Sequence, residues 1–179
     1  GKVRQGILAN LAMPFLDKLR AIVDETSNLL VLDGNEVLYI AQSESTKLLK
    51  MFTQLGAKAP LYCTGGGKAI LAYKPLSFQE LALSKINFQK YTENTIVTAD
   101  EMRKELETIK KQGYSIDNEE REKGITCVAA PIFDCYGEVI AAVSISGPSY
   151  RIKEKDLNSI ISSVVLTAKK ISANLGYAE

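Results

Sequence analysis

The sequence predicts an α+β fold in two or three layers, with a mainly antiparallel sheet flanked by helices. Two pairs of apolar segments, one pair near each end of the chain, are joined by short turn-forming stretches typical of β-hairpins. Long stretches near both ends carry apolar residues at helical spacing, and such helices must bury their apolar faces against a sheet. A chain of 179 residues is long enough for one sizeable core, so we expect residues 1–179 to form a single domain.

The first predicted elements are an amphipathic helix over residues ~6–25 and a hairpin. Pro14 should kink this helix or mark its restart. Its apolar face would be formed by Leu8, Leu11, Ala12, Phe15, Leu16, Leu19, Ile22 and Val23. In "NLLVLDGNEVLYIAQ", two apolar runs flank Asp33-Gly34-Asn35, which is a hairpin turn signal. The stretch "LLKMFTQLG" predicts a third strand that ends at Gly56.

The middle of the chain is predicted to be helical. In "SFQE" and "TADE", Ser77 and Thr98 can each cap a helix while a glutamate three positions later reaches back. The helix after Thr98 should end at Gly113. Its buried face would be formed by Met102, Leu106 and Ile109. The segment "YTENTIVT" lacks a helical period and predicts a loop or a short extended piece.

A second hairpin and a long helix should complete the chain. The strands "GITCVAAPIF" and "EVIAAVSIS" are joined by "DCYG", whose Gly137 suits a tight turn. Period two divides the second strand into one face with Ile140, Ala142, Ser144 and Ser146 and another with Val139, Ala141, Val143 and Ile145. A helix from Leu157 should stop at Gly176. The charged run "DNEEREKG" predicts a solvated loop, and "PSYRI" a turn.

The composition bounds the possible partners. Lys plus Arg (22) nearly balances Asp plus Glu (21), so the chain lacks the basic footprint of phosphate-backbone binding. Any contact with DNA is therefore expected from another part of the molecule. The apolar stretch "ILANLAMPFL" is interrupted by Asn10 and Pro14, so we expect neither a membrane span nor a signal peptide.

The side chains available for catalysis are few. The sequence has no histidine, which removes Ser-His-Asp and Cys-His catalysis and every imidazole-based metal site. Cys63, Cys127 and Cys135 contain no CxxC pair and cannot all pair within one chain, so we expect a reducing cytoplasm and no disulfide framework. A metal site of three cysteines and Asp117 would lack close-spaced ligand pairs. We expect no catalytic residue, metal or cofactor.

The glycine run "LYCTGGGKAI" does not match a nucleotide loop. Tyr62 stands where a P-loop needs its first glycine, and Ala69 follows Lys68 where Ser or Thr is required. The dinucleotide fingerprint fails at Ile70. Thr64 can instead cap a short helix, which would leave the amides of Gly65, Gly66 and Gly67 free for a small carboxylate. The glycines equally fit a tight turn with close packing.

Five ordered blocks of the chain resemble the effector-binding domain of the IclR family of bacterial transcription regulators. The blocks are "LDGNEVLYIAQ", "APLYCTGGGKAILAY", "GYSIDNEE", "GITCVAAPIFD" and "AAVSISGPSYRI". The resemblance implies a GAF-like sensor domain that works as a homodimer or tetramer. It also implies a preceding winged helix-turn-helix domain that binds DNA, with residues 1–25 as the end of the linker and the first helix. The start at Gly1 without Met agrees with a fragment that lacks this DNA-binding domain.

The resemblance also implies a site for a small carboxylate effector, such as a 2-oxo acid, a sugar acid or an aromatic acid. The residues that match the family's positions are Gly65, Gly66, Asp117, Cys127, Ser144, Ser146, Met51 and Ile125. Asp117 would repel an anion, at about 1–4 kcal/mol for charges ~4 Å apart. It must therefore accept ligand hydroxyls, act through water or become protonated, unless it only caps a loop. The serines, in turn, would simply bond to neighbouring backbone if no ligand binds.

Three functions remain open on the sequence. The first is a ligand-sensing domain that alters operator binding by population shift. The second is a GAF-like, cysteine-dependent reductase of methionine sulfoxide, in which Cys127 and Cys63 would have to approach each other. The third is an oligomerisation scaffold that binds no metabolite.

Overall fold

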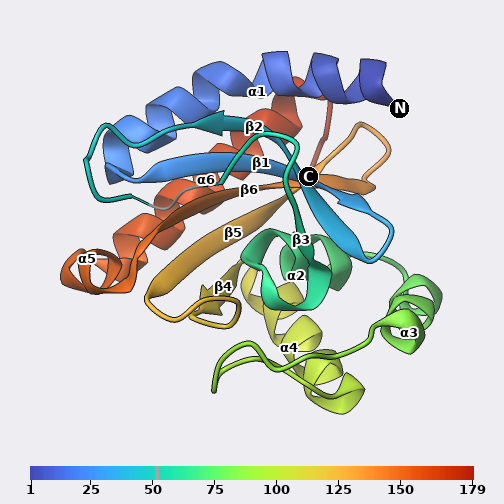
Figure 1. The fold of residues 1–179 in the computed structure, drawn as a ribbon. Coiled ribbons are helices and arrows are strands. Elements are labelled where there is room, and N and C mark those ends of the chain that lie inside the picture. Colours follow the sequence, from blue (N-terminus) through green and yellow to red (C-terminus); the bar gives the residue numbers. More distant parts are fainter. Residues whose placement is uncertain (51–52) are drawn as a thin grey trace.

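An antiparallel sheet forms the centre of the computed structural model, which describes residues 1–50 and 53–179 (Figure 1). Its six strands run in the order β3-β2-β1-β6-β5-β4. They are β1 (Thr26–Asp33), β2 (Glu36–Ser43), β3 (Lys58–Pro60), β4 (Ser115–Asn118), β5 (Ile125–Phe133) and β6 (Val139–Pro148). The predicted α+β class with a mainly antiparallel sheet is confirmed.

Helices cover both faces of this sheet (Figure 1). The α-helices are α1 (Lys2–Val23), α2 (Gly65–Ala72), α3 (Leu76–Lys85), α4 (Ala99–Gln112), α5 (Ser149–Glu154) and α6 (Leu157–Asn174), and η1 (Leu61–Cys63) is a 3₁₀ turn. Helices α1 and α6 pack on one face, whereas α2 and α4 lie on the other. Within the described residues, no helix is both long enough and apolar enough to span a membrane.

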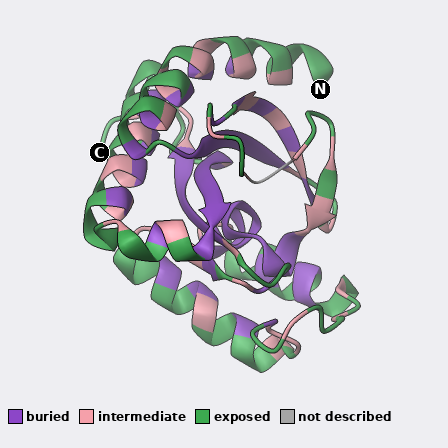
Figure 2. Cartoon of the chain, turned by 60° about the vertical axis from the view of Figure 1, so that its left-hand side comes forward, coloured by how far each residue is buried: buried purple, intermediate pink, exposed green. Residues whose placement is uncertain are grey.

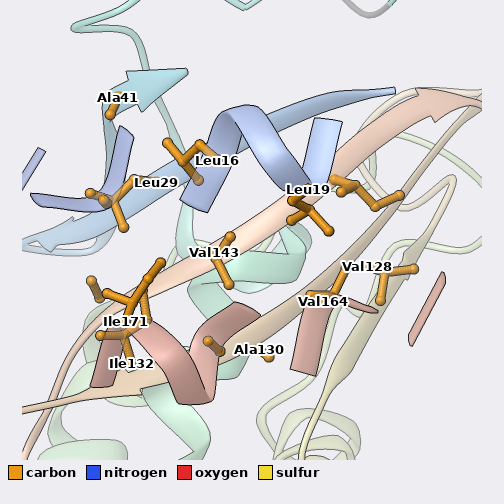
Figure 3. Close-up of a cluster of buried hydrophobic side chains, with 14 of the residues drawn as sticks. Leu16, Leu19, Leu29, Ala41, Val128, Ala130, Ile132, Val143, Val164 and Ile171 are labelled. Atoms are coloured by element: carbon orange, nitrogen blue, oxygen red, sulfur yellow. The ribbon is translucent and has the colours of Figure 1, made fainter. Parts of the chain in front are cut away.

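The larger core lies between the sheet and the pair α1 and α6 (Figure 3). Leu16 and Leu19 of α1 and Val164 and Ile171 of α6 are at most 1% exposed, and they pack against the apolar face of the central strands. The outer sides of both helices are largely exposed, while the central strands are almost entirely buried (Figure 2). This burial pattern agrees with the helical spacing in the sequence. Pro14 was expected to kink the first helix or to mark its restart; helix α1 continues through Pro14, so no restart occurs there.

Both predicted hairpins form, but the third strand lies elsewhere. Asp33 pairs with Glu36 across the first turn, and the second turn contains Gly137 at φ 78°. Strand β3 is Lys58–Pro60, beyond the predicted "LLKMFTQLG". In that stretch Leu48 and Leu49 are exposed, so their apolar character does not mark a buried strand face.

A single-residue bulge changes which side chains of β6 share a face. Ile132 pairs with Ala141 and Phe133 with Val139, which leaves Ile140 as the extra residue. Val139 and Ala142 therefore pack together on the α2 face, whereas Ile140 packs on the α1 and α6 face. The predicted alternation is wrong at Val139 and Ile140, because a bulge reverses the side-chain parity on one side of it.

The helix ends predicted from local sequence signals are correct in part. Thr98 caps α4 by accepting a hydrogen bond from the amide of Glu101, and α4 ends at Gly113 in the left-handed conformation. The predicted cap at Ser77 is wrong, because α3 begins at Leu76 after Pro75 and Ser77 lies in its first turn. The segment "PSYRI", predicted as a turn, forms α5 instead. Strand β4 was not predicted. It comprises only Ser115–Asn118 within "GYSIDNEE", which is too short to show a clear alternating pattern.

Candidate ligand-binding site

A pocket of about 400 Å³ lies on the α2 face of the sheet, at the N-terminus of α2. Its wall also includes residues of the β2–β3 connection and of the loop after β4. Among the residues expected at a ligand site, Gly65, Gly66, Asp117, Ile125, Cys127 and Ser144 line this cavity, which we call the α2 pocket. Ser146 lies beside it without lining it, and Met51 falls outside the described residues.

The start of α2 supplies main-chain donors to the α2 pocket. Thr64 caps the helix as predicted, since its hydroxyl accepts a hydrogen bond from the Gly67 amide at 3.2 Å. The expectation that Gly67 also offers a free amide is therefore wrong. Among the described residues, the amides of Gly65 and Gly66 have no hydrogen-bond acceptor. These two N–H groups lie at the positive end of the helix dipole, where a small anion is favoured.

The three glycines differ in how much room a side chain would have. A Cβ at Gly67 would lie 2.3 Å from the Leu61 carbonyl oxygen, so the backbone itself excludes any side chain there. A Cβ at Gly66 would lie 2.9 Å from the side chain of Leu30, and one at Gly65 would make an ordinary 3.4 Å contact with Ala129. Gly67 thus serves close packing, whereas Gly65 leaves room beside the pocket.

Hydroxyl groups on β6 form a polar network at the floor of the pocket. The Asn28 side-chain amide donates to Ser144 Oγ at 3.3 Å and to Ser146 Oγ at 3.2 Å. The Cys127 thiol also donates to Ser146, at 3.2 Å. The serines therefore bond to side chains rather than to backbone. Because Ser144 accepts from Asn28 and lines the cavity, its own O–H can donate to a bound acceptor.

Asp117 brings a carboxyl group with a perturbed pKa to the pocket. Its side chain is 4% exposed, and burial together with the nearby Glu120 charge raises its pKa to about 7. Hydrogen bonds from the amides of Glu120 and Arg121 and the charge of Lys68 act in the opposite direction. Protonation, one of the three routes by which this carboxyl avoids repelling an anion, is therefore accessible near neutral pH.

The lysine of the glycine run has a structural partner. Lys68 is fully buried, and its ammonium lies 2.7 Å from Glu105, 2.8 Å from Glu120 and 2.8 Å from the Ile116 carbonyl oxygen. Burial alone would lower its pKa, but the Glu120 and Glu105 charges outweigh burial and the pKa is raised. The run "DNEEREKG" is thus not wholly solvated, because Glu120 is 5% exposed and joins this cluster.

Sequence patterns missed several residues of the pocket. Leu30, Tyr39, Thr53 and Arg121 line it, although none was singled out. A bulge beside Ile40 aligns Tyr39 with Leu30, so simple alternation along β2 could not place this tyrosine. Arg121 lies within the charged run "DNEEREKG", which was predicted to be a solvated loop, so its place in the pocket lining was missed.

The cysteines lack the features of a redox or metal centre. Burial raises the pKa of the Cys63 thiol to about 12 and raises that of Cys127 as well. All three cysteines are free. Cys63 and Cys127 are buried, whereas Cys135 is exposed. Within residues 1–50 and 53–179, no three Cys, Asp or Glu side chains converge as a candidate metal site.

Comparison with known proteins gives one consistent family. Residues 3–173 match the model described as bacterial transcriptional regulator IclR C-terminal. The chain is 36% identical over 160 residues to the HTH-type transcriptional regulator KdgR of Escherichia coli and 38% identical over 169 residues to the HTH-type transcriptional repressor AllR of Salmonella paratyphi A. These matches cover 89% and 93% of the chain but only 61% of either relative.

The fold agrees with a solved member of this group. The crystal structure of the Thermotoga maritima IclR superimposes with a TM-score of 0.90 at 37% identity, covering 95% of this chain and 69% of that one. The chain therefore corresponds to one part of longer proteins.

Proposed function

The chain belongs to the IclR family of bacterial transcriptional regulators, and we propose that it is the ligand-sensing domain of such a regulator. The ligand would be a small organic acid, of the 2-oxo, sugar-acid or aromatic class. It would alter operator binding by a winged helix-turn-helix domain outside residues 1–179. The observation that carries this proposal is the α2 pocket, where free glycine amides and the Ser144 hydroxyl line one cavity.

The chemistry of the α2 pocket suits a small acid. Its volume of about 400 Å³ lies within the range of small-molecule sites. The Gly65 and Gly66 amides would bind a carboxylate, Ser144 would donate to a second oxygen, and Leu30 and Ile125 would pack on the carbon skeleton. Asp117 would accept hydroxyl groups when ionised and donate a hydrogen bond when protonated.

Signal transfer would follow from differential binding. We envisage a homodimer or tetramer in which the effector binds one arrangement of subunits better than another, so that the spacing of the DNA-binding domains shifts. Exposed apolar residues of α1, such as Val3, Ile7 and Ile22, are suited to subunit contacts. Whether the effector induces or represses depends on which arrangement fits the operator.

A panel of pyruvate, D-gluconate and benzoate tests the proposal by thermal shift and calorimetry. A ligand at 100 times its Kd stabilises the folded state by ~2.7 kcal/mol, equivalent to about 5–10 °C for a chain of this size. Ser144→Ala should weaken binding about 5- to 10-fold through the lost hydrogen bond. Ser146→Ala is the matched control, because Ser146 lies on the same strand outside the pocket lining and should change affinity less. Equal effects of the two variants would contradict the assigned pocket.

The reductase alternative is less favoured. The named relatives are transcriptional regulators, and a buried thiol with a raised pKa is a poor nucleophile. We expect no turnover of methionine sulfoxide by the wild-type chain and retained acid binding by Cys127→Ser. Measurable turnover of methionine sulfoxide that Cys127→Ser abolishes would favour the reductase over the ligand-sensing domain. A pure scaffold predicts that no acid shifts the melting temperature.

A further inference from the structure

The two basic side chains at the α2 pocket differ in whether a carboxylate neutralises them. Asp117 and Glu122 bring acidic groups to its lining, and Lys58 and Arg121 bring basic groups. Lys58 is paired with Asp33 at 2.9 Å. Among the described residues, no carboxylate lies within ion-pair distance of the Arg121 guanidinium. Arg121 is therefore the basic group at this pocket whose charge is left for a ligand.

Arg121 is held at the pocket by an aromatic ring. Its guanidinium carbon lies 4.1 Å from the centroid of Tyr91. In a contact of this kind the face of the guanidinium is occupied while its N–H edge stays free, which is the geometry for bidentate binding of a carboxylate. Tyr91 itself belongs to the segment before α4, so two loops far apart in sequence meet here.

The charge of Arg121 affects groups at and next to the cavity. Burial raises the pKa of Tyr39 and Cys63, and the Arg121 charge opposes the rise at both residues. Arg121 also borders a second depression, of about 400 Å³, that Tyr91, Thr92 and Asn94 help to line. The side chain thus stands between the α2 pocket and the outer surface.

We propose that Arg121, positioned by Tyr91, is the residue that selects carboxylate-bearing ligands at the mouth of the α2 pocket. The glycine amides contribute only partial charges, and the acidic groups of the lining oppose an anion. The full positive charge of Arg121 would strengthen the preference for a carboxylate over its neutral analogue beyond what the glycine amides provide. This inference rests on the proposed function, because it assumes that the α2 pocket binds an acid.

Matched acids and amides separate charge recognition from shape recognition. The probes are pyruvate with pyruvamide and benzoate with benzamide, measured by calorimetry at constant ionic strength on wild type, Arg121→Gln and Arg121→Lys. Arg121→Gln should weaken acid binding roughly 10- to 100-fold and leave amide binding unchanged. Arg121→Lys should be intermediate, because lysine keeps the charge without the planar fork. Lys123→Gln makes the same charge change in the same loop outside the pocket lining and should have little effect.

Tyr91 is tested as a positioning residue. Tyr91→Phe keeps the ring and should retain acid affinity, whereas Tyr91→Leu should lose about two- to five-fold for acids only. Circular dichroism and melting temperature report whether each variant folds, and Arg121→Lys provides a second variant at that position.

The outcomes distinguish the two proposals. If acids bind wild type and Ser144→Ala weakens them but Arg121→Gln does not, Arg121 is not the selecting residue and the sensor function stands. If amides bind wild type as tightly as acids, the inference fails in the same way. If neither acids nor amides bind wild type at millimolar concentration, the acid-sensing function fails and the role of Arg121 fails with it.

Discussion

The ammonium of Lys68 lies 2.8 Å from the carboxylate of Glu120, with 0% and 7% of the two side chains exposed. Lys68 also bonds Glu105 of α4, so it joins α2 to α4 and to the loop after β4. Lys68→Met would leave these carboxylates without their counter-charge and should lower the free energy of unfolding by about 3–5 kcal/mol. Urea unfolding measures the change. Lys58→Met breaks a half-exposed pair and is the control, for which we expect little loss; equal losses would contradict a special role for burial.

The glycines of α2 should differ sharply in their tolerance of a methyl group. Gly67→Ala would force a Cβ against the Leu61 carbonyl and the Thr64 cap, and we expect a loss of at least about 3 kcal/mol or failure to fold. Gly65→Ala makes only ordinary contacts, so it should fold and instead weaken acid binding at the pocket. Thermal melting and calorimetry on both variants check this. A well-folded Gly67→Ala protein would refute the packing explanation.

The effect of a substitution at Gly147 on stability should depend on the side chain of Glu25. A Cβ at Gly147 would lie 2.8 Å from Glu25 Oε1, and this carboxylate is held at 2.7 Å by both Arg151 and Lys155. Gly147→Ala should therefore cost about 1–3 kcal/mol of stability. In a Glu25→Ala background the added methyl has free space, so the same substitution should cost little. A double-mutant cycle by urea unfolding measures the coupling, and additive effects would count against it.

Asp117 should make stability depend on pH. Its pKa is about 7 in the folded state against 3.8 for the ordinary side chain, so between pH 4 and pH 7 the folded state binds more protons than the unfolded chain. Stability from this group therefore falls as pH rises through that window, by at most about 4 kcal/mol. Burial and the Glu120 charge raise this pKa, and the amides of Glu120 and Arg121 and the Lys68 charge oppose the rise.

Asp117→Asn removes this penalty. Relative to wild type, the variant should gain stability at pH 8 and gain little at pH 4.5, as measured by urea unfolding. Glu107→Gln, an exposed change on α4, should give the same difference at both pH values. A gain for Asp117→Asn that does not increase with pH would show that the carboxyl is ionised without cost.

The sequence was most informative where one local interaction decides the structure. Asp33-Gly34-Asn35, the Thr64 cap and the Gly113 stop each depend on a few neighbouring residues, and each was predicted correctly. The faces of β6 were wrong beyond the bulge at Ile140, because a register shift depends on the partner strand.

The candidate site was predictable only in part. Six of the eight residues implied by the family pattern line the α2 pocket, and the hydroxyl pair on β6 was visible from period two. Arg121 and Lys68 could not be assigned from sequence, because one depends on a stacking contact with Tyr91 and the other on two carboxylates from distant segments. Such contacts between remote parts of the chain leave no periodic signal.

The two outer strands of the sheet are poorly suited to further pairing. Strand β3 is three residues long and ends in Pro60, which has no amide hydrogen to donate. On β4, the carbonyl oxygens of Ile116 and Asn118 already accept hydrogen bonds from Lys68 and from the Asn94 side chain. An extended peptide or a neighbouring copy therefore finds few open main-chain groups at either edge. Strand addition at β3 and β4 is therefore disfavoured, which favours contacts through helices and side chains at these two edges.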